Sequence, residues 1–136
     1  MNPTLKNFLF VILALLIGGM VNMGIIVLGP NIIPSPEGVN PQDINSIKEN
    51  ANLYSAKHFI IPFLAHALGT LVGAFIIAKL ASTHHKKFAL IVGAVFCLGG
   101  IIMAIGLPEF WKFSIIDILL AYFPMALLGW SMAGKP

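Results

Sequence analysis

The sequence has few charged residues and no arginine. Only 10% of its 136 residues are charged, whereas about 25% are charged in an ordinary soluble domain. All eight basic residues are lysines. Because planar guanidinium groups are the preferred side chains for clamping phosphate and reading nucleic-acid bases, the composition argues against nucleic acid as a partner.

Groups that carry catalysis or bind metal are also scarce. Cys97 is the only cysteine, so the chain can form neither an intrachain disulfide nor a Cys-x-x-Cys pair. The sequence contains no nucleophile beside a base, no glycine-rich phosphate loop after a strand and no paired acids. His84 and His85 are expected on the opposite membrane face from His58, about 30 Å away. We therefore expect no metal and no cofactor, and these residues favour a nonenzymatic protein.

Apolar residues make up 58% of the chain, more than a water-soluble fold of this size can bury. Four segments each reach the roughly 20 apolar residues that a helix needs to cross a bilayer. We therefore predict an all-α membrane protein, a single integral domain over residues 1–136 that forms a four-transmembrane-helix bundle. The expected spans are residues 8–29, 59–79, 87–107 and 113–133.

The only sizeable segment outside the expected spans is the first loop, residues 30–58. Its first part is rich in proline, and a helix signal follows. Asn40 is a good N-cap, Pro41 suits the first helical position and Asp43 suits the first turn. We predict a short amphipathic helix over residues 41–56 that lies on the outer membrane surface or caps the bundle. Its apolar face would consist of Ile44, Ile47, Ala51 and Tyr54.

The distribution of lysines predicts the orientation in the membrane. Lys79, Lys86 and Lys87 flank or lie in the loop between the second and third expected spans, which is the most basic loop. The positive-inside rule places such a loop in the cytoplasm. With four spans, both termini are then cytoplasmic, in agreement with Lys6 and Lys135 near the ends. The compact chain favours a multi-pass protein of a bacterial inner membrane.

Polar side chains occur inside three of the expected spans. Asn22 and His66 lie about 10 Å below the outer ends of their helices, and Asp117 lies about 6 Å below. Tyr122 lies roughly one turn deeper than Asp117. We expect all four to face the bundle interior, with His66 hydrogen-bonded to Asn22 or Asp117. Such residues either hold helices together or form a ligand, proton or ion site, and both interpretations remain open.

Glycines occur where helices are expected to pack closely. Gly69 and Gly73 form a small-xxx-small pair, which lets helix backbones approach one another in lipid. We expect these positions to pack within one bundle rather than between copies. The full set of predicted packing positions is Gly18, Gly19, Gly69, Gly73, Gly99 and Gly100.

Three functions are compatible with this sequence. The small area outside the membrane and the glycine-rich helices favour a nonenzymatic accessory or interaction subunit, whose partners are the lipid bilayer and other membrane subunits or a second copy. The alternative is a small oligomeric transporter or channel that uses Asn22, His66 and Asp117. A membrane enzyme that acts on a lipid or quinone is the third. A water-accessible path past His66 would favour transport.

Overall fold

The computed structural model describes residues 2–136, and every regular element in that range is a helix. Four helical stretches are long and apolar enough to cross a membrane. The sequence-based prediction of an all-helical chain with four such stretches is confirmed at this level. The main helices are α1 (Pro3–Leu28), α3 (Ile60–Leu80), α4 (His85–Gly106), α5 (Trp111–Leu120) and α6 (Phe123–Ala133).

The helices begin and end where capping chemistry allows. α1 begins at Pro3 rather than at residue 8, because the side chain of Asn2 accepts a hydrogen bond from the Thr4 N–H at 2.9 Å. Proline suits this first position, where its missing N–H costs nothing. A short 3₁₀ helix, η3 (Ala56–Phe59), precedes α3.

The fourth expected span is not one continuous helix. The structure divides residues 113–133 between α5 and α6, and Ala121 and Tyr122 form the break. Pro124 explains the break, because it has no N–H to donate to the carbonyl of Leu120 and its ring clashes with that carbonyl. The prediction of a single helix was therefore wrong in this detail.

The loop helix is shorter than the predicted residues 41–56 and begins later. The helix α2 spans Ile44–Glu49, and its N-cap is Asp43, whose Oδ1 accepts from the Asn45 N–H at 3.0 Å. The predicted cap, Asn40, instead accepts from the Gln42 N–H in a turn before the helix. Asn50 leaves helical backbone geometry, and the chain continues as the 3₁₀ helices η2 (Ala51–Leu53) and η3. No residue of α2 is buried, and Ile44 is 44% exposed.

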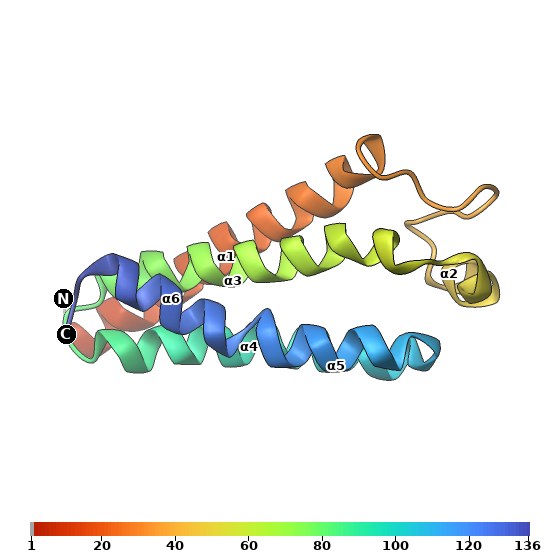
Figure 1. Ribbon diagram of the computed structural model, residues 1–136. Helices are drawn as coiled ribbons and strands as arrows, with labels where there is room; N and C mark the ends of the chain where they lie inside the picture. The colour runs from red at the N-terminus through yellow and green to blue at the C-terminus, as the bar shows by residue number, and fades with distance from the viewer. Residues whose placement is uncertain (1) are drawn as a thin grey trace.

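The bundle has two different ends. Both chain termini and the α3–α4 connection lie at one end, and α2 with its long loop lies at the other (Figure 1). We call these the terminal end and the loop end. α3 is the central helix, since it packs along α1 and against α6 and α4, whereas its contact with α5 is slight. Figure 1 accordingly shows α3 and α5 drawn apart toward the loop end.

Small side chains pack the half of the bundle nearer the terminal end, the terminal half. Alanines from α1, α3, α4 and α6 are fully buried there, and Ile77 and Val92 are the large members of the cluster. Because alanine and glycine let helices approach closely, this half forms without bulky residues. The buried cluster consists of Ala14, Ala74, Ile77, Ala78, Ala81, Ala89, Val92, Ala126 and Ala133.

Several predicted glycines lie at close helix contacts. A Cβ built on Gly69 would lie 2.8 Å from the carbonyl oxygen of Gly18, and one on Gly73 would lie 3.0 Å from that of Ala14, so both fix the distance between α1 and α3. A Cβ on Gly100 would overlap the ring of Tyr122.

Two of the predicted packing glycines contact nothing. A Cβ built on Gly19 or on Gly99 would meet no atom within 4 Å. Their assignment to packing within the bundle was therefore wrong, because each faces outward on its helix.

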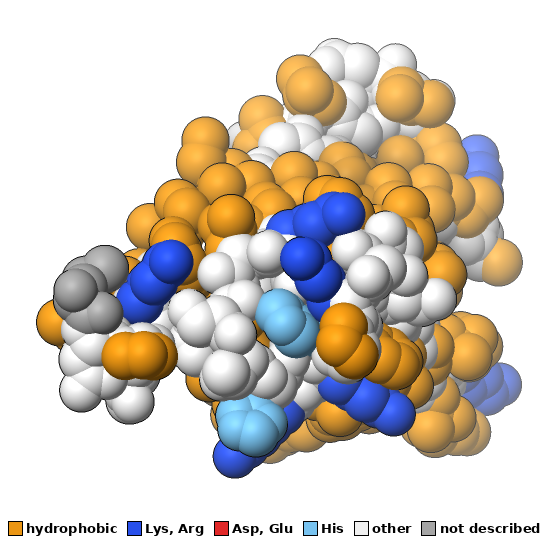
Figure 2. Space-filling view, turned by 90° about the vertical axis from the view of Figure 1, so that its left-hand side faces the viewer, with side chains coloured by type: hydrophobic (Ala, Val, Ile, Leu, Met, Phe, Trp, Pro, Cys, Tyr) orange, Lys and Arg blue, Asp and Glu red, His pale blue; other side chains and the backbone are white. Residues whose placement is uncertain are grey.

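Charge is distributed unequally between the ends. Figure 2 views the terminal end, where lysines and histidines are visible and no acidic side chain is. The four acids other than Asp117 belong to the loop end. They are Glu37, Asp43, Glu49 and Glu109, accompanied by Lys48, Lys57 and Lys112.

Candidate functional site

Three polar side chains meet between α3 and the break in the fourth span. Nδ1 of His66 lies 2.8 Å from Oδ2 of Asp117. The hydroxyl of Tyr122 donates to the same oxygen at 2.8 Å. The rings of His66 and Tyr122 are stacked, with centroids 5.9 Å apart. We call this group the His–Asp–Tyr cluster.

The break in the helix makes this geometry possible. On a continuous helix Tyr122, five residues after Asp117, would point about 140° away around the axis at 100° per residue. The Asp117 carbonyl accepts from the Ala121 N–H at 2.8 Å, so the last turn of α5 is intact up to the break. Tyr122 then leaves the helical path, with φ −114° and ψ −77°. Its hydroxyl thereby reaches the carboxyl group that a regular helix would have turned away from it.

The cluster is buried but incompletely hydrogen-bonded. Asp117 is 3% exposed and Tyr122 is 2% exposed, while the side chain of His66 is 19% exposed. Oδ1 of Asp117 has no hydrogen-bond partner among residues 2–136. Because an unpaired buried polar atom costs free energy, this oxygen is the least satisfied position of the cluster.

Thr70 lies one turn further along α3 from His66 and is fully buried. Its hydroxyl oxygen is a second atom without a hydrogen-bond partner in the described chain. α3 thus carries two polar side chains at successive turns, and the deeper of them is unpaired.

His66 contacts the buried carboxyl group of Asp117 and is itself less buried. Its Nδ1 is engaged with Asp117. Its Nε2 forms no hydrogen bond within residues 2–136 and is not one of the buried unpartnered atoms there. Since the two ring nitrogens of a neutral imidazole are one donor and one acceptor, His66 can exchange a proton at Nε2 while Nδ1 holds Asp117.

Asn22 does not join the cluster by a hydrogen bond. It packs on α3 one turn from His66, where a Cβ on Gly69 would lie 2.8 Å from the Cβ of Asn22. Its side chain is half-buried and forms no hydrogen bond with His66 or Asp117. Of the four polar residues singled out in the sequence, the structure therefore brings three into contact and leaves Asn22 beside them.

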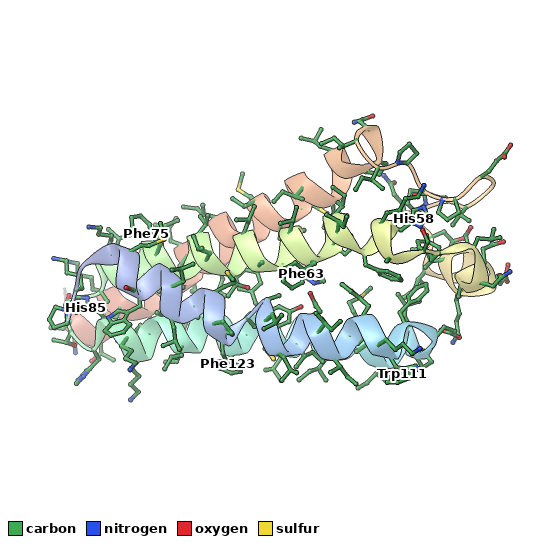
Figure 3. All side chains as sticks on the ribbon, viewed as in Figure 1. His58, Phe63, Phe75, His85, Trp111 and Phe123 are labelled. Carbon is green, nitrogen blue, oxygen red and sulfur yellow. The ribbon has the colours of Figure 1, made fainter. Side chains whose placement is uncertain are left out.

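Sequence reasoning missed a group of aromatic rings at the loop end, the loop-end aromatic cluster. The ring of Phe59 lies 4.8 Å from that of Phe113 and 5.0 Å from that of Phe110. Tyr54 lies 5.2 Å from Phe110, and burial raises the pKa of its phenol. These rings occupy the region where α3 and α5 diverge, and Figure 3 shows side chains filling the space between the two ribbons. The density of aromatic residues before both spans was the available signal.

Sequence reasoning also missed two polar contacts that order the terminal end. Asn7 is 4% exposed, and its Oδ1 accepts from the Ser82 N–H at 2.8 Å. His85 donates from Nδ1 to the carbonyl of Ala78 at 2.9 Å. These contacts join the start of α1, the end of α3 and the start of α4.

No group of three or more His, Cys, Asp and Glu side chains within residues 2–136 is arranged to hold a metal ion. The chain matches no protein-family model, no curated protein and no solved structure. Its function is therefore argued from the His–Asp–Tyr cluster and its surroundings alone.

Proposed function

We propose that this protein moves protons across a membrane, alone or together with a solute, and that Asp117 is the group that binds the proton. The observation that carries the proposal is the buried carboxyl group of Asp117, whose Oδ1 has no partner in the described chain. This supports the transporter over the accessory subunit that the sequence favoured. An ionisable group at membrane depth is costly to bury, and such groups mark proton and ion pathways.

A purely structural connector explains the cluster less well. An aspartate that only holds helices together gains most when both oxygens are hydrogen-bonded. Here Oδ2 accepts from Tyr122 and contacts His66, whereas Oδ1 lacks a partner. A proton on Oδ2 would neutralise the carboxyl group, and this oxygen could still accept from Tyr122 while its O–H faces Nδ1 of His66. The geometry therefore accommodates two protonation states of Asp117 without rearrangement of its neighbours.

His66 supplies the route from the loop end. We propose that a proton arrives at Nε2 while the proton on Nδ1 passes to Oδ2 of Asp117, so that the imidazole gains one proton and loses one. The first step requires water at Nε2, which forms no hydrogen bond within residues 2–136, and the 2.8 Å contact permits the second step. Loss of the proton toward the terminal end would require movement of α6 about the break at Ala121 and Tyr122, since the alanine-rich terminal half is closely packed.

The proposed orientation places the terminal end in the cytoplasm of a bacterial cell. Positive charge on that end supports it, because cytoplasmic loops are enriched in lysine. In a Cys97→Ala background, Asn45→Cys and Ser82→Cys should react with a membrane-impermeant thiol reagent from opposite sides of the membrane. Labelling of Asn45→Cys from the cytoplasmic side alone would reverse the proposed orientation.

Proton flux into liposomes tests the function. The purified protein is reconstituted with a pH-sensitive dye inside, and a pH difference is imposed. Wild type should change the internal pH faster than empty liposomes, and Asp117→Asn should not. Glu109→Gln is the matched control, because it removes an exposed acid from the same region. Equal flux in wild type, Asp117→Asn and empty liposomes would contradict the proposal.

The variant His66→Leu distinguishes a proton-carrying role of His66 from a purely structural one. If His66 carries protons, this variant should remain folded in detergent and lose most of the flux. Loss of thermal stability together with no flux in either wild type or variant would leave His66 as a helix-connecting residue.

An accessory subunit remains a second candidate because of α1. Only three residues of α1 are buried, against eight residues of α3. Such a helix presents most of its surface to lipid or to another protein. Purification from the native membrane in mild detergent tests this candidate. A different membrane protein recovered in fixed stoichiometry would support it, and recovery of this chain alone would contradict it.

A further inference from the structure

We propose that an anionic phospholipid binds in a groove between α4 and α6 at the terminal end. The groove has a volume of about 610 Å³. Its entrance carries the basic side chains His84, Lys86 and Lys87, and its length is lined by apolar residues that include Ala94 and Phe123. This site is separate from the His–Asp–Tyr cluster and does not depend on the proposed proton movement.

The order of residues along the groove matches one lipid leaflet. His84 precedes the first turn of α4, and Ala94 lies ten residues further along the helix. That separation corresponds to about 15 Å at the helical rise, which is half of a hydrocarbon core about 30 Å thick. Cations therefore lie at headgroup level, and the apolar lining extends to about the depth that one acyl chain reaches.

The charge at the entrance favours a negatively charged headgroup. Five of the eight lysines belong to the terminal end, and Figure 2 shows no acidic side chain on that face. A phosphate placed there meets cations, and no Asp or Glu side chain is visible on this face. Lys86 is held in place, since its ammonium lies 4.9 Å from the centroid of the Trp130 ring. The five terminal-end lysines are Lys6, Lys79, Lys86, Lys87 and Lys135.

The apolar lining selects a lipid over a free anion. Ile91 is 37% exposed and Phe123 is 44% exposed, so the groove has an uncovered apolar wall. Inorganic phosphate would contact only the entrance and leave this wall without an occupant. A phospholipid fills both parts. A zwitterionic headgroup brings its own cation toward the lysines, so anionic lipids should bind more tightly.

Native mass spectrometry of the detergent-solubilised protein measures the binding. We expect a tighter dissociation constant for phosphatidylglycerol than for phosphatidylcholine with the same acyl chains. Each lysine near an anionic headgroup contributes about fivefold in affinity. Lys87→Gln should therefore weaken phosphatidylglycerol binding about fivefold, and Lys86→Gln with Lys87→Gln should weaken it further. The double variant Lys48→Gln with Lys57→Gln is the matched control at the loop end and should bind as wild type does.

A second variant tests the acyl part of the groove. Ala94→Phe places a ring where the chain should lie and leaves the lysines unchanged, so it should also weaken phosphatidylglycerol binding. Thermal unfolding without lipid shows whether each variant is folded. If the lysine double variant does not fold, Lys87→Gln alone is the test, because it retains the Lys86–Trp130 contact. Equal affinity for the two lipids would overturn the proposal, as would equal losses in the groove and control double variants. Inorganic phosphate that displaces bound phosphatidylglycerol at comparable concentration would also overturn it, because the acyl chain would then contribute nothing.

Discussion

The two halves of the bundle hold their helices together in opposite ways. In the terminal half, glycine and alanine bring α1, α4 and α6 close to α3. In the half nearer the loop end, which we call the loop half, large rings separate α3 from α5. The rings of Phe59 and Phe113 are stacked there, with centroids 4.8 Å apart. Small residues allow a short helix separation, whereas large rings require a wider one. The His–Asp–Tyr cluster lies where one arrangement changes into the other.

This position explains why a costly carboxyl group is tolerated. Ala121 and Tyr122, which follow α5, are buried in a cluster with Ala67 and Cys97, and Tyr122 donates a hydrogen bond to Asp117. Toward α3 it meets His66, which is less buried. Asp117 therefore has one partly exposed polar neighbour and is itself buried.

The largest expected effect breaks a close contact between α1 and α3. Gly69→Leu places a Cβ 2.8 Å from both the Gly18 carbonyl oxygen and the Asn22 Cβ. Since backbone cannot move aside as a side chain can, the variant should lose about 3 kcal/mol of stability. Unfolding in detergent measures the loss. Gly19→Leu is the control, because nothing lies within 4 Å of that position. Equal losses in the two variants would show that α1 and α3 do not pack as described.

A cavity in the terminal half should have the next largest effect. Ile77 is 0% exposed, and Ile77→Ala should cost about 2 kcal/mol through lost packing contacts. Ile105 is 75% exposed, so Ile105→Ala should change stability little. Chemical denaturation of both variants in the same detergent gives the comparison. A larger loss for Ile105→Ala would place the core elsewhere.

At the boundary between the halves, Tyr122→Phe removes one hydrogen bond and keeps the ring. The variant should lose about 1 kcal/mol, the usual net value of a hydrogen bond, because Oδ2 of Asp117 then retains only His66. Asp117→Asn with Tyr122→Phe completes a double-mutant cycle, and we expect the two changes to be non-additive. Strict additivity in thermal unfolding would mean that the two side chains do not interact.

The smallest expected effect concerns the loop half alone. Phe59→Leu removes one ring from the loop-end aromatic cluster and should cost about 1 kcal/mol or less. Because Phe59 and Ile77 share no contacts, the stability losses of Phe59→Leu and Ile77→Ala should be additive within about 0.5 kcal/mol. Marked coupling in the double variant would show that the halves do not behave independently.

The sequence predicted the four apolar helices because a long apolar run without charge has few structural alternatives in lipid. It also predicted that His66 would meet Asn22 or Asp117, from their similar depth and the cost of leaving such groups unpaired, and the structure shows the contact with Asp117. It did not predict the break at Ala121 and Tyr122, although Pro124 was visible, because proline is often tolerated within membrane helices. The break decides where the Tyr122 hydroxyl points, so this part of the cluster could not be derived from helical spacing.

The loop helix and the outward glycines show a different limit. Asn40 and Asp43 are both good caps, and only the folded chain shows that Asp43 begins α2. Gly18 and Gly19 are adjacent and alike in the sequence, yet only Gly18 faces α3. Because lipid is as apolar as the core, hydropathy does not indicate which side of a membrane helix is buried.

The central claim is that Asp117 gains and loses a proton while it stays buried. Infrared difference spectroscopy of the protein in lipid films, recorded between acidic and alkaline buffer, detects this directly as the carbonyl stretch of a protonated carboxyl group. Wild type and Glu109→Gln should show this band in the difference spectrum, and Asp117→Asn should lack it. All three proteins must be folded at both pH values. Identical difference spectra for wild type and Asp117→Asn would mean that Asp117 holds one protonation state, and the account of proton movement would be wrong.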